Sequence, residues 1–239
     1  MKTGKRIYLS QVNVEIPNDK LIVFWDTCAL LDILRIPTRE NLNINDLLCY
    51  ERIADYIENN QLVSITSGLV VNEFLDHYEE EHSKLLHIQT KLKQQIHDYA
   101  DFMVSDKKRE HIVKAVDLLN FEHRLNMVLN RILKNTFILK EQNKYRDFAD
   151  YRLRNKMAPA ARKAEYKDCY IWGTFISLVH ALNPISPYVA FITVNSKDYT
   201  DDTGHLHSHI MTDCRFMPSM RVKLKVGELY GDLRSILVV

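Results

Sequence analysis

Four acidic residues stand at positions where an ordinary surface charge is not expected, and Asp26 is the first along the chain. It directly follows the apolar run 21–25, at the predicted carboxyl end of a strand. Ligands gather outside the carboxyl ends of parallel strands, so this position favours a functional carboxylate. An N-cap for the helix predicted at 27–36 explains Asp26 equally well.

Asp168 opens a predicted helix that runs to about Leu182. The apolar stripe of this helix contains Trp172, Phe175 and Val179, and the helical period places Asp168 on the same stripe. A buried carboxylate is costly unless it is paired, hydrogen-bonded or bound to a metal ion. The helix dipole offers a partial structural explanation near an N-terminus. The stripe shared with Trp172 favours function.

Glu73 and Asp198 are ambiguous when each is taken alone. Glu73 lies one turn beyond Leu69 and Val70, at the edge of an apolar helix face, where a solvated glutamate is common. Asp198 follows the apolar run 188–194, again at the carboxyl end of a predicted strand, where an ordinary polar loop also explains it. Their significance therefore depends on the other two acids.

Taken together, these carboxylates indicate a metal site. Acidic side chains that converge on one sheet edge repel one another unless a cation is bound, and hard oxygen ligands suit Mg²⁺ or Mn²⁺. Such ions lower the pKa of a bound water and stabilise charge on a phosphodiester. The set Asp26, Glu73, Asp168 and Asp198 therefore predicts a metal-dependent nuclease.

The elements that must position these acids form an α/β pattern. Apolar runs at 21–25, 62–66, 136–139 and 188–194 do not alternate with polar residues, which predicts parallel strands buried on both faces. Segments with helical spacing separate them, so we expect a parallel sheet flanked by helices. The stretch 83–134 is long enough for a helical hairpin, with a turn near 104–106.

At this point the chain resembles a PIN domain. The family pattern has a strand-end Asp followed by an apolar helix, then a helix Glu, a helix Asp and a final T-x-N-x-x-D-F. The matching pieces are DTCALLD from Asp26, VVNEFLD around Glu73, KDCYI around Asp168, and TVNSKDY with Thr193, Asn195 and Asp198. Tyr199 stands where the pattern has Phe. The resemblance covers roughly residues 20–200.

The resemblance implies a Rossmann-like PIN fold in a single domain over 1–239. Its core would span about 20–82 and 135–205, with a helical insertion at 83–134 and a C-terminal extension at 206–239. Glu73 and Asp168 are farther apart in sequence than in compact toxin-type members, which argues against assigning the chain to a toxin–antitoxin pair.

The implied activity is an endoribonuclease that uses Mg²⁺ or Mn²⁺. Asp26, Asp168 and Asp198 would be direct metal ligands, and Glu73 would bind a second ion or orient the attacking water. Thr27 and Asn195 would support the site.

A basic segment at 144–167 offers contacts for RNA. It holds eight Lys and Arg residues against three acids, with four interleaved aromatic residues. Basic side chains neutralise phosphates and aromatic rings stack on bases, as single-stranded nucleic acid requires. A solvated helix with its aromatic residues packed inward explains the pattern as well. The expected RNA contacts are Arg152, Arg154, Lys156, Arg162, Lys163 and Lys167.

Overall composition limits the other classes of function. The chain has 239 residues with 32 Lys and Arg against 31 Asp and Glu, and this net charge of +1 argues against coating nucleic acid through bulk charge. Four widely spaced cysteines and the lack of a visible secretory signal favour a cytoplasmic protein. Residues 169–196 contain no Asp, Glu, Lys or Arg, but Pro184 and Pro187 divide them, so we expect buried core and no membrane segment.

Some alternatives stay open at this level. A catalytically silent PIN-like module that binds RNA or a protein partner, or a DNA or flap-type nuclease of the same fold, would share most of these features. The partners we expect are single-stranded RNA and either an inhibitor protein or a second copy of the chain. His205, His207 and His209 alternate as metal-binding strand residues do, although a polar loop is the commoner explanation.

Overall fold

A computed structural model describes residues 3–17, 19–39, 43–103, 106–117, 120–182 and 186–237. Its centre is a parallel sheet in the order β1-β4-β3-β2-β5-β6. The strands are β1 (Arg6–Ile7), β2 (Leu21–Trp25), β3 (Leu62–Ser67), β4 (Thr136–Leu139), β5 (Tyr188–Ile192) and β6 (Met220–Lys223). The predicted α/β class and its four parallel strands are confirmed.

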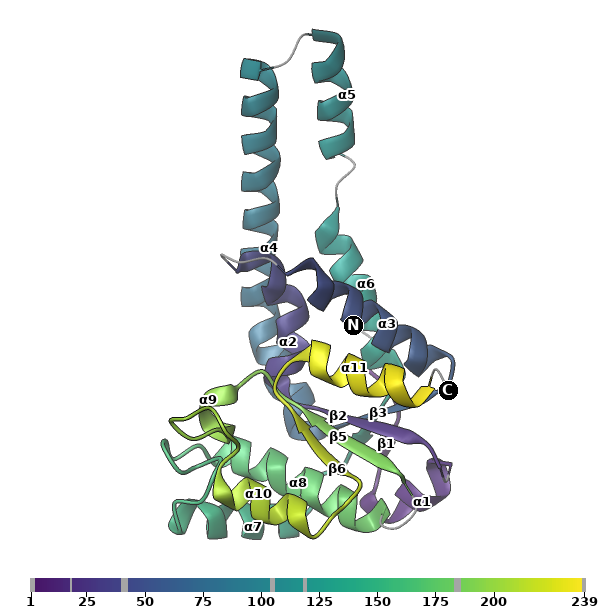
Figure 1. The fold of residues 1–239 in the computed structure, drawn as a ribbon, viewed down its shortest axis with the longest axis vertical. Helices are drawn as coiled ribbons and strands as arrows, with labels where there is room; N and C mark the ends of the chain where they lie inside the picture. Colours follow the sequence, from purple (N-terminus) through teal and green to yellow (C-terminus); the bar gives the residue numbers. More distant parts are fainter. Residues whose placement is uncertain are drawn as a thin grey trace.

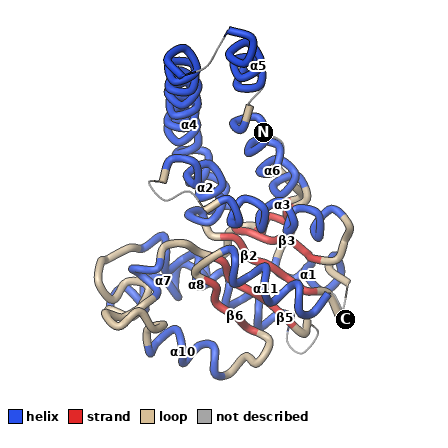
Figure 2. The backbone as a smooth tube through the Cα atoms, turned by 45° about the horizontal axis from the view of Figure 1, so that its top comes forward, coloured by secondary structure: helices blue, strands red, loops and turns tan. Residues whose placement is uncertain are grey.

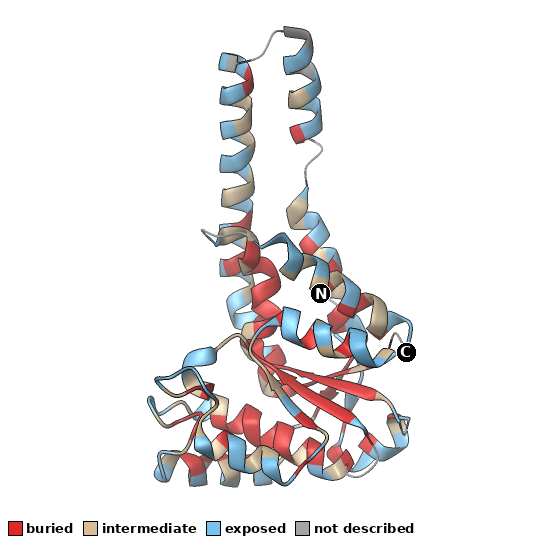
Figure 3. Ribbon diagram, viewed as in Figure 1, coloured by how far each residue is buried: buried red, intermediate tan, exposed pale blue. Residues whose placement is uncertain are grey.

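The two central strands explain why the apolar runs are continuous. All five residues of β2 and all five of β5 are buried, because helices cover both faces of the sheet. Helices α7, α8 and α10 lie on one side of the sheet, and α3, α6 and α11 lie on the other (Figure 1). Colouring by burial shows the buried layer running through the sheet and the helix faces against it (Figure 3).

The helices follow the strands along the chain. Their bounds are α1 (Val12–Glu15), α2 (Thr27–Arg35), α3 (Ile44–Glu58), α4 (Gly68–Met103), α5 (Asp106–Asp117), α6 (Phe121–Lys134), α7 (Asn143–Arg154), α8 (Tyr166–Leu182), α9 (Ser196–Tyr199), α10 (Ser208–Arg215) and α11 (Val226–Leu237). Helix α2 ends at Arg35 and a short 3-10 turn follows it.

The helical insertion projects away from the sheet (Figures 1 and 2). Helix α4 runs for 36 residues without a break, so the insertion begins inside a helix whose first turns belong to the core. Its base is tied to α6 by hydrogen bonds from Tyr78 Oη to Asn126 Oδ1 (3.0 Å) and between His82 Nε2 and Glu122 Oε1 (2.6 Å). The far part of α4 lies beside α5 (Figure 2).

Two predicted breaks fall partly outside the described residues. The turn near 104–106 and the division at Pro184 include positions that the structure does not describe. The C-terminal residues form part of the sheet, because β6 pairs with β5 and α11 packs against α3. None of the described helices combines the length and the apolar character that crossing a membrane requires.

Candidate active site

Asp26 lies at the carboxyl end of β2 and begins α2. Its side chain is only 2% exposed. Oδ1 accepts a hydrogen bond from the Thr27 backbone N–H (2.8 Å), and Oδ2 accepts one from Thr193 Oγ1 (2.6 Å). Burial raises the pKa of Asp26 to about 6, and the charge of Glu73 adds to the rise. Asp26 therefore caps the helix and also places a carboxylate in the interior, where burial disfavours its ionised form.

Glu73 reaches the same place from α4, which starts directly after β3. Its Oε2 accepts a hydrogen bond from Thr27 Oγ1 (2.6 Å), so Thr27 links the glutamate to the start of α2. Lys167 Nζ lies 3.6 Å from Oε1 of Glu73. Thr27 is one of the two residues expected to support the site, and this contact is the one through which it would do so.

Asp168 lies in the first turn of α8 and is half-buried. The pKa of its carboxyl is raised to about 8, first by burial and then by the charges of Asp26, Asp198 and Glu73. Within the described ranges no side chain or backbone N–H donates a hydrogen bond to this carboxylate. The electrostatic coupling shows that all four predicted acids are close enough to oppose one another's ionisation.

Asp198 is held by the loop after β5. Its Oδ2 accepts a hydrogen bond from Asn195 Nδ2 (2.6 Å), and the backbone N–H of Asn195 donates to Thr193 Oγ1 (3.1 Å). A hydrogen-bonded chain therefore runs from Asp26 through Thr193 and Asn195 to Asp198. The sequence pattern contained Thr193 but assigned it no role. Thr193 contacts Asp26 because β2 and β5 are adjacent in the sheet, and the sequence pattern alone does not show which strands are neighbours.

The sheet topology explains this convergence. Strand β2 lies between β3 and β5, and all three end at the same edge because they run parallel. The Asp26 N–H donates to the Ile192 carbonyl (3.1 Å), which continues the β2–β5 ladder into the site. The carboxyl edge of the sheet therefore brings three separate chain segments to one place, and the start of α8 brings the fourth.

An aromatic layer packs beneath the acids. The rings of Trp172 and Tyr199 lie 5.8 Å apart, and Phe191 lies 5.4 Å from Tyr199, measured between centroids. The Tyr199 hydroxyl is buried and has no hydrogen-bond partner among the described residues. Burial, followed by the charges of Asp26 and Asp168, raises the pKa of Tyr199. This apolar floor lowers the local dielectric and strengthens the repulsion between the carboxylates.

The donor chemistry of the site fits a hard divalent cation. In the part of the chain that the structure describes, no three His, Cys, Asp or Glu side chains are arranged as a ready metal cage. The four carboxylates nevertheless supply the oxygen ligands that Mg²⁺ and Mn²⁺ prefer. The Asp168 carboxylate, destabilised by three other acids and without a hydrogen-bond donor, is the group whose ionisation a cation would favour most.

The structure contradicts the RNA-binding role expected for Arg152. This side chain is 1% exposed and forms an ion pair with Asp213 and a hydrogen bond to the Ala158 carbonyl. Tyr145 is also buried, against Tyr170, so its ring is not available to stack on a base. In this part of α7 the side chains therefore pack inward, as the alternative explanation of the basic segment expected. Both contact residues that are distant in sequence, Arg152 with Asp213 and Tyr145 with Tyr170.

The other five basic residues remain at the surface. Lys167 borders Glu73, as described above, and the charges of Asp198 and Asp168 contribute to the raised pKa of Lys163 after its contact with Glu165. Arg162 pairs with the exposed Asp202. Arg154 and Lys156 are exposed near the end of α7. Lys163 and Lys167 are therefore the two predicted basic residues that lie beside the acids.

The three histidines do not act together. His205 Nδ1 is hydrogen-bonded with Thr203 Oγ1 (2.8 Å), and His209 Nδ1 accepts from the Ala158 N–H (3.3 Å). His207 is turned inward, and burial lowers its pKa. Among the residues described they form no metal-binding group, which agrees with the polar-loop explanation.

Comparison with known proteins gives one positive result. A family model described as PIN domain matches residues 23–199, a range that contains all four acids and both supporting residues. No curated protein and no solved structure matches the chain.

Proposed function

This chain belongs to the PIN domain family, whose fold is of the nuclease type, and on that premise we propose that it is a metal-dependent endoribonuclease. It hydrolyses RNA phosphodiester bonds at Asp26, Glu73, Asp168 and Asp198. The observation that carries this proposal is the convergence of four carboxylates at the carboxyl edge of the sheet, three of which are held by Thr27, Thr193 and Asn195. Burial, and then the charges of the other three acids, raise the pKa of Asp168 to about 8. A fold has no structural use for mutually destabilising carboxylates, whereas a cation-dependent active site requires them.

Asp26, Asp168 and Asp198 are the residues that would hold Mg²⁺ or Mn²⁺ directly. Glu73 would hold a second ion or orient the attacking water. When bound, such an ion supplies charge neutralisation for the phosphodiester and activation of water. The hydrogen bonds from Thr193, Asn195 and Thr27 leave lone pairs on the carboxylate oxygens free for this role.

The protein's own residues contribute orientation and substrate attraction. Thr27 fixes the Glu73 carboxylate, and Asn195 fixes that of Asp198. Lys163 and Lys167 lie beside the acids, where they attract the phosphates of the substrate on either side of the scissile bond.

Single-stranded RNA is the substrate that these surroundings favour. The side chains of Tyr151 and Tyr166 are 59% and 36% exposed on the same basic segment. Exposed rings next to cationic side chains suit unpaired bases, because a base inside a duplex is already stacked.

Cleavage of labelled single-stranded RNA by the purified protein in Mn²⁺ or Mg²⁺ tests the proposal. We expect cleavage that EDTA abolishes and that Asp26→Asn abolishes. Asp147→Asn, which changes an exposed carboxylate on α7, serves as the matched control and should cleave normally. A parallel labelled DNA strand distinguishes the two nucleic acids, and preferential cleavage of DNA would contradict the RNA assignment.

Retention of activity in Asp26→Asn would overturn the assignment of the active site. Failure of the wild-type protein to cleave any RNA in either metal, while still binding it, would replace the enzyme with a silent RNA-binding module.

A further inference from the structure

A pocket lies at the opposite edge of the sheet from the acids. It has a volume of about 440 Å³ and is lined by Leu62 and Thr136, the first residues of β3 and β4, and by Lys20, which directly precedes β2. Asp26 follows the other end of β2, so the parallel strands separate this pocket from the candidate active site. Its volume lies in the range of small-molecule binding sites.

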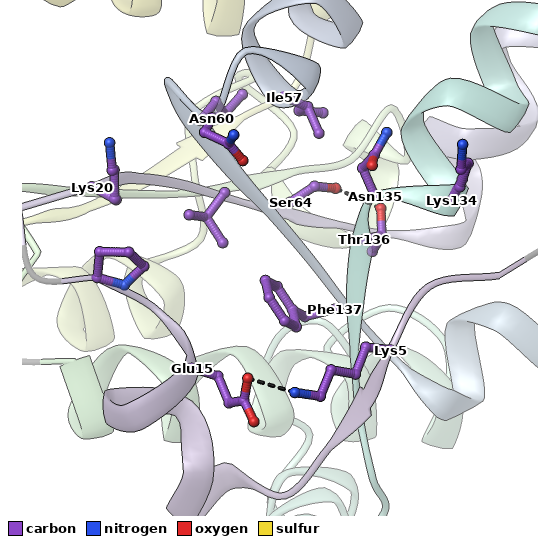
Figure 4. A pocket seen from close by; sticks show the side chains of 13 residues that line it. Lys5, Glu15, Lys20, Ile57, Asn60, Ser64, Lys134, Asn135, Thr136 and Phe137 are labelled. Carbon is purple, nitrogen blue, oxygen red and sulfur yellow. Dashed lines mark hydrogen bonds and ion pairs between the residues drawn. The ribbon is translucent and has the colours of Figure 1, made fainter.

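The rim of the pocket is cationic. Lys5, Lys20 and Lys134 line it together with one acid, Glu15. Lys5 Nζ is paired with Glu15 Oε2 at 2.6 Å. Lys20 and Lys134 have no ion-pair partner in the described part of the chain, and Figure 4 shows them on opposite sides of the pocket. Two uncompensated ammonium groups on one concave surface favour an anionic ligand.

The interior of the pocket is partly apolar. The Phe137 ring is half-buried and lies between the Lys5–Glu15 pair and Asn60 in Figure 4. Ile57 adds a buried aliphatic wall. A half-exposed ring inside a pocket provides a surface for a flat ligand group, because offset stacking needs one free face. The Asn60 side chain supplies an amide group at the rim. Asn135 Nδ2 donates to the Arg131 carbonyl (2.8 Å), so Asn135 offers its Oδ1.

The walls of the pocket are preformed. Ser64 Oγ accepts a hydrogen bond from Trp25 Nε1 (2.8 Å) and lies 2.6 Å from Thr136 Oγ1, so the polar atoms of the back wall already have partners. A Cβ at Gly4 would lie 1.9 Å from the Thr136 carbonyl oxygen, so only glycine permits the N-terminal segment to lie this close to β4. That segment carries Lys5 to the rim.

We propose that this pocket binds a free nucleoside monophosphate. A lysine on one side of the rim holds the phosphate and the Phe137 ring receives the base. The lysine on the opposite side and the asparagine side chains contact the polar edge of the base. Cation, amide and exposed ring in one cavity match the three parts of such a molecule better than they match inorganic phosphate alone. The inference goes beyond the proposed nuclease activity and does not depend on it.

Titration calorimetry of the full chain with each of the four common ribonucleoside 5′-monophosphates tests this proposal. The buffer contains EDTA, which keeps metal-dependent binding at the acids out of the measurement. We expect saturable binding of at least one nucleotide, and a dissociation constant about tenfold larger for Lys20→Gln and for Lys134→Gln, since each removes one charge-assisted contact. Phe137→Leu should weaken binding of the nucleotide but not of inorganic phosphate.

Two controls make the result specific. Lys91→Gln removes an exposed charge from the projecting part of α4 and should leave binding unchanged. Asp26→Asn should also bind normally, which separates this site from the candidate active site. Absence of saturable binding by all four nucleotides overturns the proposal, as does binding that neither lysine substitution weakens. Inorganic phosphate bound as tightly as the nucleotides would contradict the part assigned to Phe137.

Discussion

Asp26 illustrates how one side chain serves structure and chemistry together. It accepts the N-terminal hydrogen bond of α2 and is also buried, at 2% exposure. Both explanations that its sequence position allowed are therefore compatible. The cap and the active-site roles can be distinguished by replacing the Asp26 carboxylate with an amide of the same shape and measuring stability and metal binding.

Asp26→Asn is expected to leave the metal-free melting temperature unchanged or slightly higher. The amide oxygen still accepts from the Thr27 N–H, the Thr193 hydroxyl can turn to accept from the amide, and the repulsion with the other acids is relieved. In excess Mn²⁺ the wild-type melting temperature should rise and that of the variant should not. Thermal unfolding with and without Mn²⁺ measures both. A large metal-free decrease would instead make Asp26 a structural cap only.

Asp168 predicts a pH dependence of stability in the metal-free protein. Its folded-state pKa of about 8 lies above its ordinary value of 3.8. The neutral carboxyl therefore stabilises the fold fully below pH 3.8, and that contribution is lost as the pH rises through about 8. The wild-type melting temperature in EDTA should fall over this range more than that of Asp168→Asn. Asp147→Asn is the control, and equal slopes for Asp168→Asn and wild type would contradict the shifted pKa.

At the scale of elements, an ion pair between a buried arginine and a half-buried aspartate joins the basic segment to the C-terminal part of the chain. Arg152 on α7 contacts Asp213 on α10, and Trp172 Nε1 on α8 donates to the same carboxylate at 2.8 Å. The Ala158 carbonyl accepts from Arg152, while the Ala158 N–H donates to His209. These contacts hold the loop after α7, which carries Lys163, beside the acids.

Arg152→Ala should therefore destabilise the protein by about 3 kcal/mol, because it removes a buried side chain and leaves the half-buried Asp213 without its ion-pair partner. Urea unfolding measures this difference. Arg154→Ala, two residues along the same helix but exposed, should leave the free energy of unfolding within about 0.5 kcal/mol of wild type and weaken RNA binding instead. An Arg152→Ala protein with normal stability and weakened RNA binding would restore the role first expected for this arginine.

The sequence pattern predicted the features that depend on residues close together in the chain, namely the buried strands and the buried face of a helix. The continuous apolar run 21–25 indicated a strand buried on both faces, and all of it is buried. The stripe through Trp172 indicated the buried face of α8, which is buried around Trp172 and Phe175. Short-range spacing carries this information because helix and strand periods repeat within a few residues.

Other features could not be predicted because their causes are distant in sequence. Arg152 is buried by Asp213, which lies 61 residues further along the chain, and no periodicity connects the two. Thr193 donates to Asp26 across a separation of 167 residues. Helix α4 runs unbroken from Gly68 across the expected start of the insertion at residue 83, because its helical spacing continues there.

At the scale of the whole molecule, the projecting helices are separable from the acid site. Gln89 Oε1 accepts from the Glu122 backbone N–H (3.0 Å), so α4 and α6 already meet at this level. Leu85, nearby on α4, belongs to the main core. The acids lie at the carboxyl edge of the sheet, away from the far end of the projection (Figure 1).

Replacement of residues 91–119 by a short glycine–serine linker should therefore give a folded protein with an unchanged rate of RNA cleavage. The linker needs to span only the distance between the adjacent ends of α4 and α6. Cleavage assays beside circular dichroism check rate and fold in the same preparation. A folded but inactive variant would show that the projection contributes to substrate binding.

The central claim is that four carboxylates at one sheet edge form a metal-binding active site, and calorimetric titration with Mn²⁺ tests it most directly. We predict saturable Mn²⁺ binding by the wild-type protein and by Asp147→Asn. Asp26→Asn and Asp168→Asn should each bind at least about tenfold more weakly, because each removes a charged ligand. Wild-type protein that takes up no Mn²⁺, or variants that bind it as tightly as wild type, would contradict the claim.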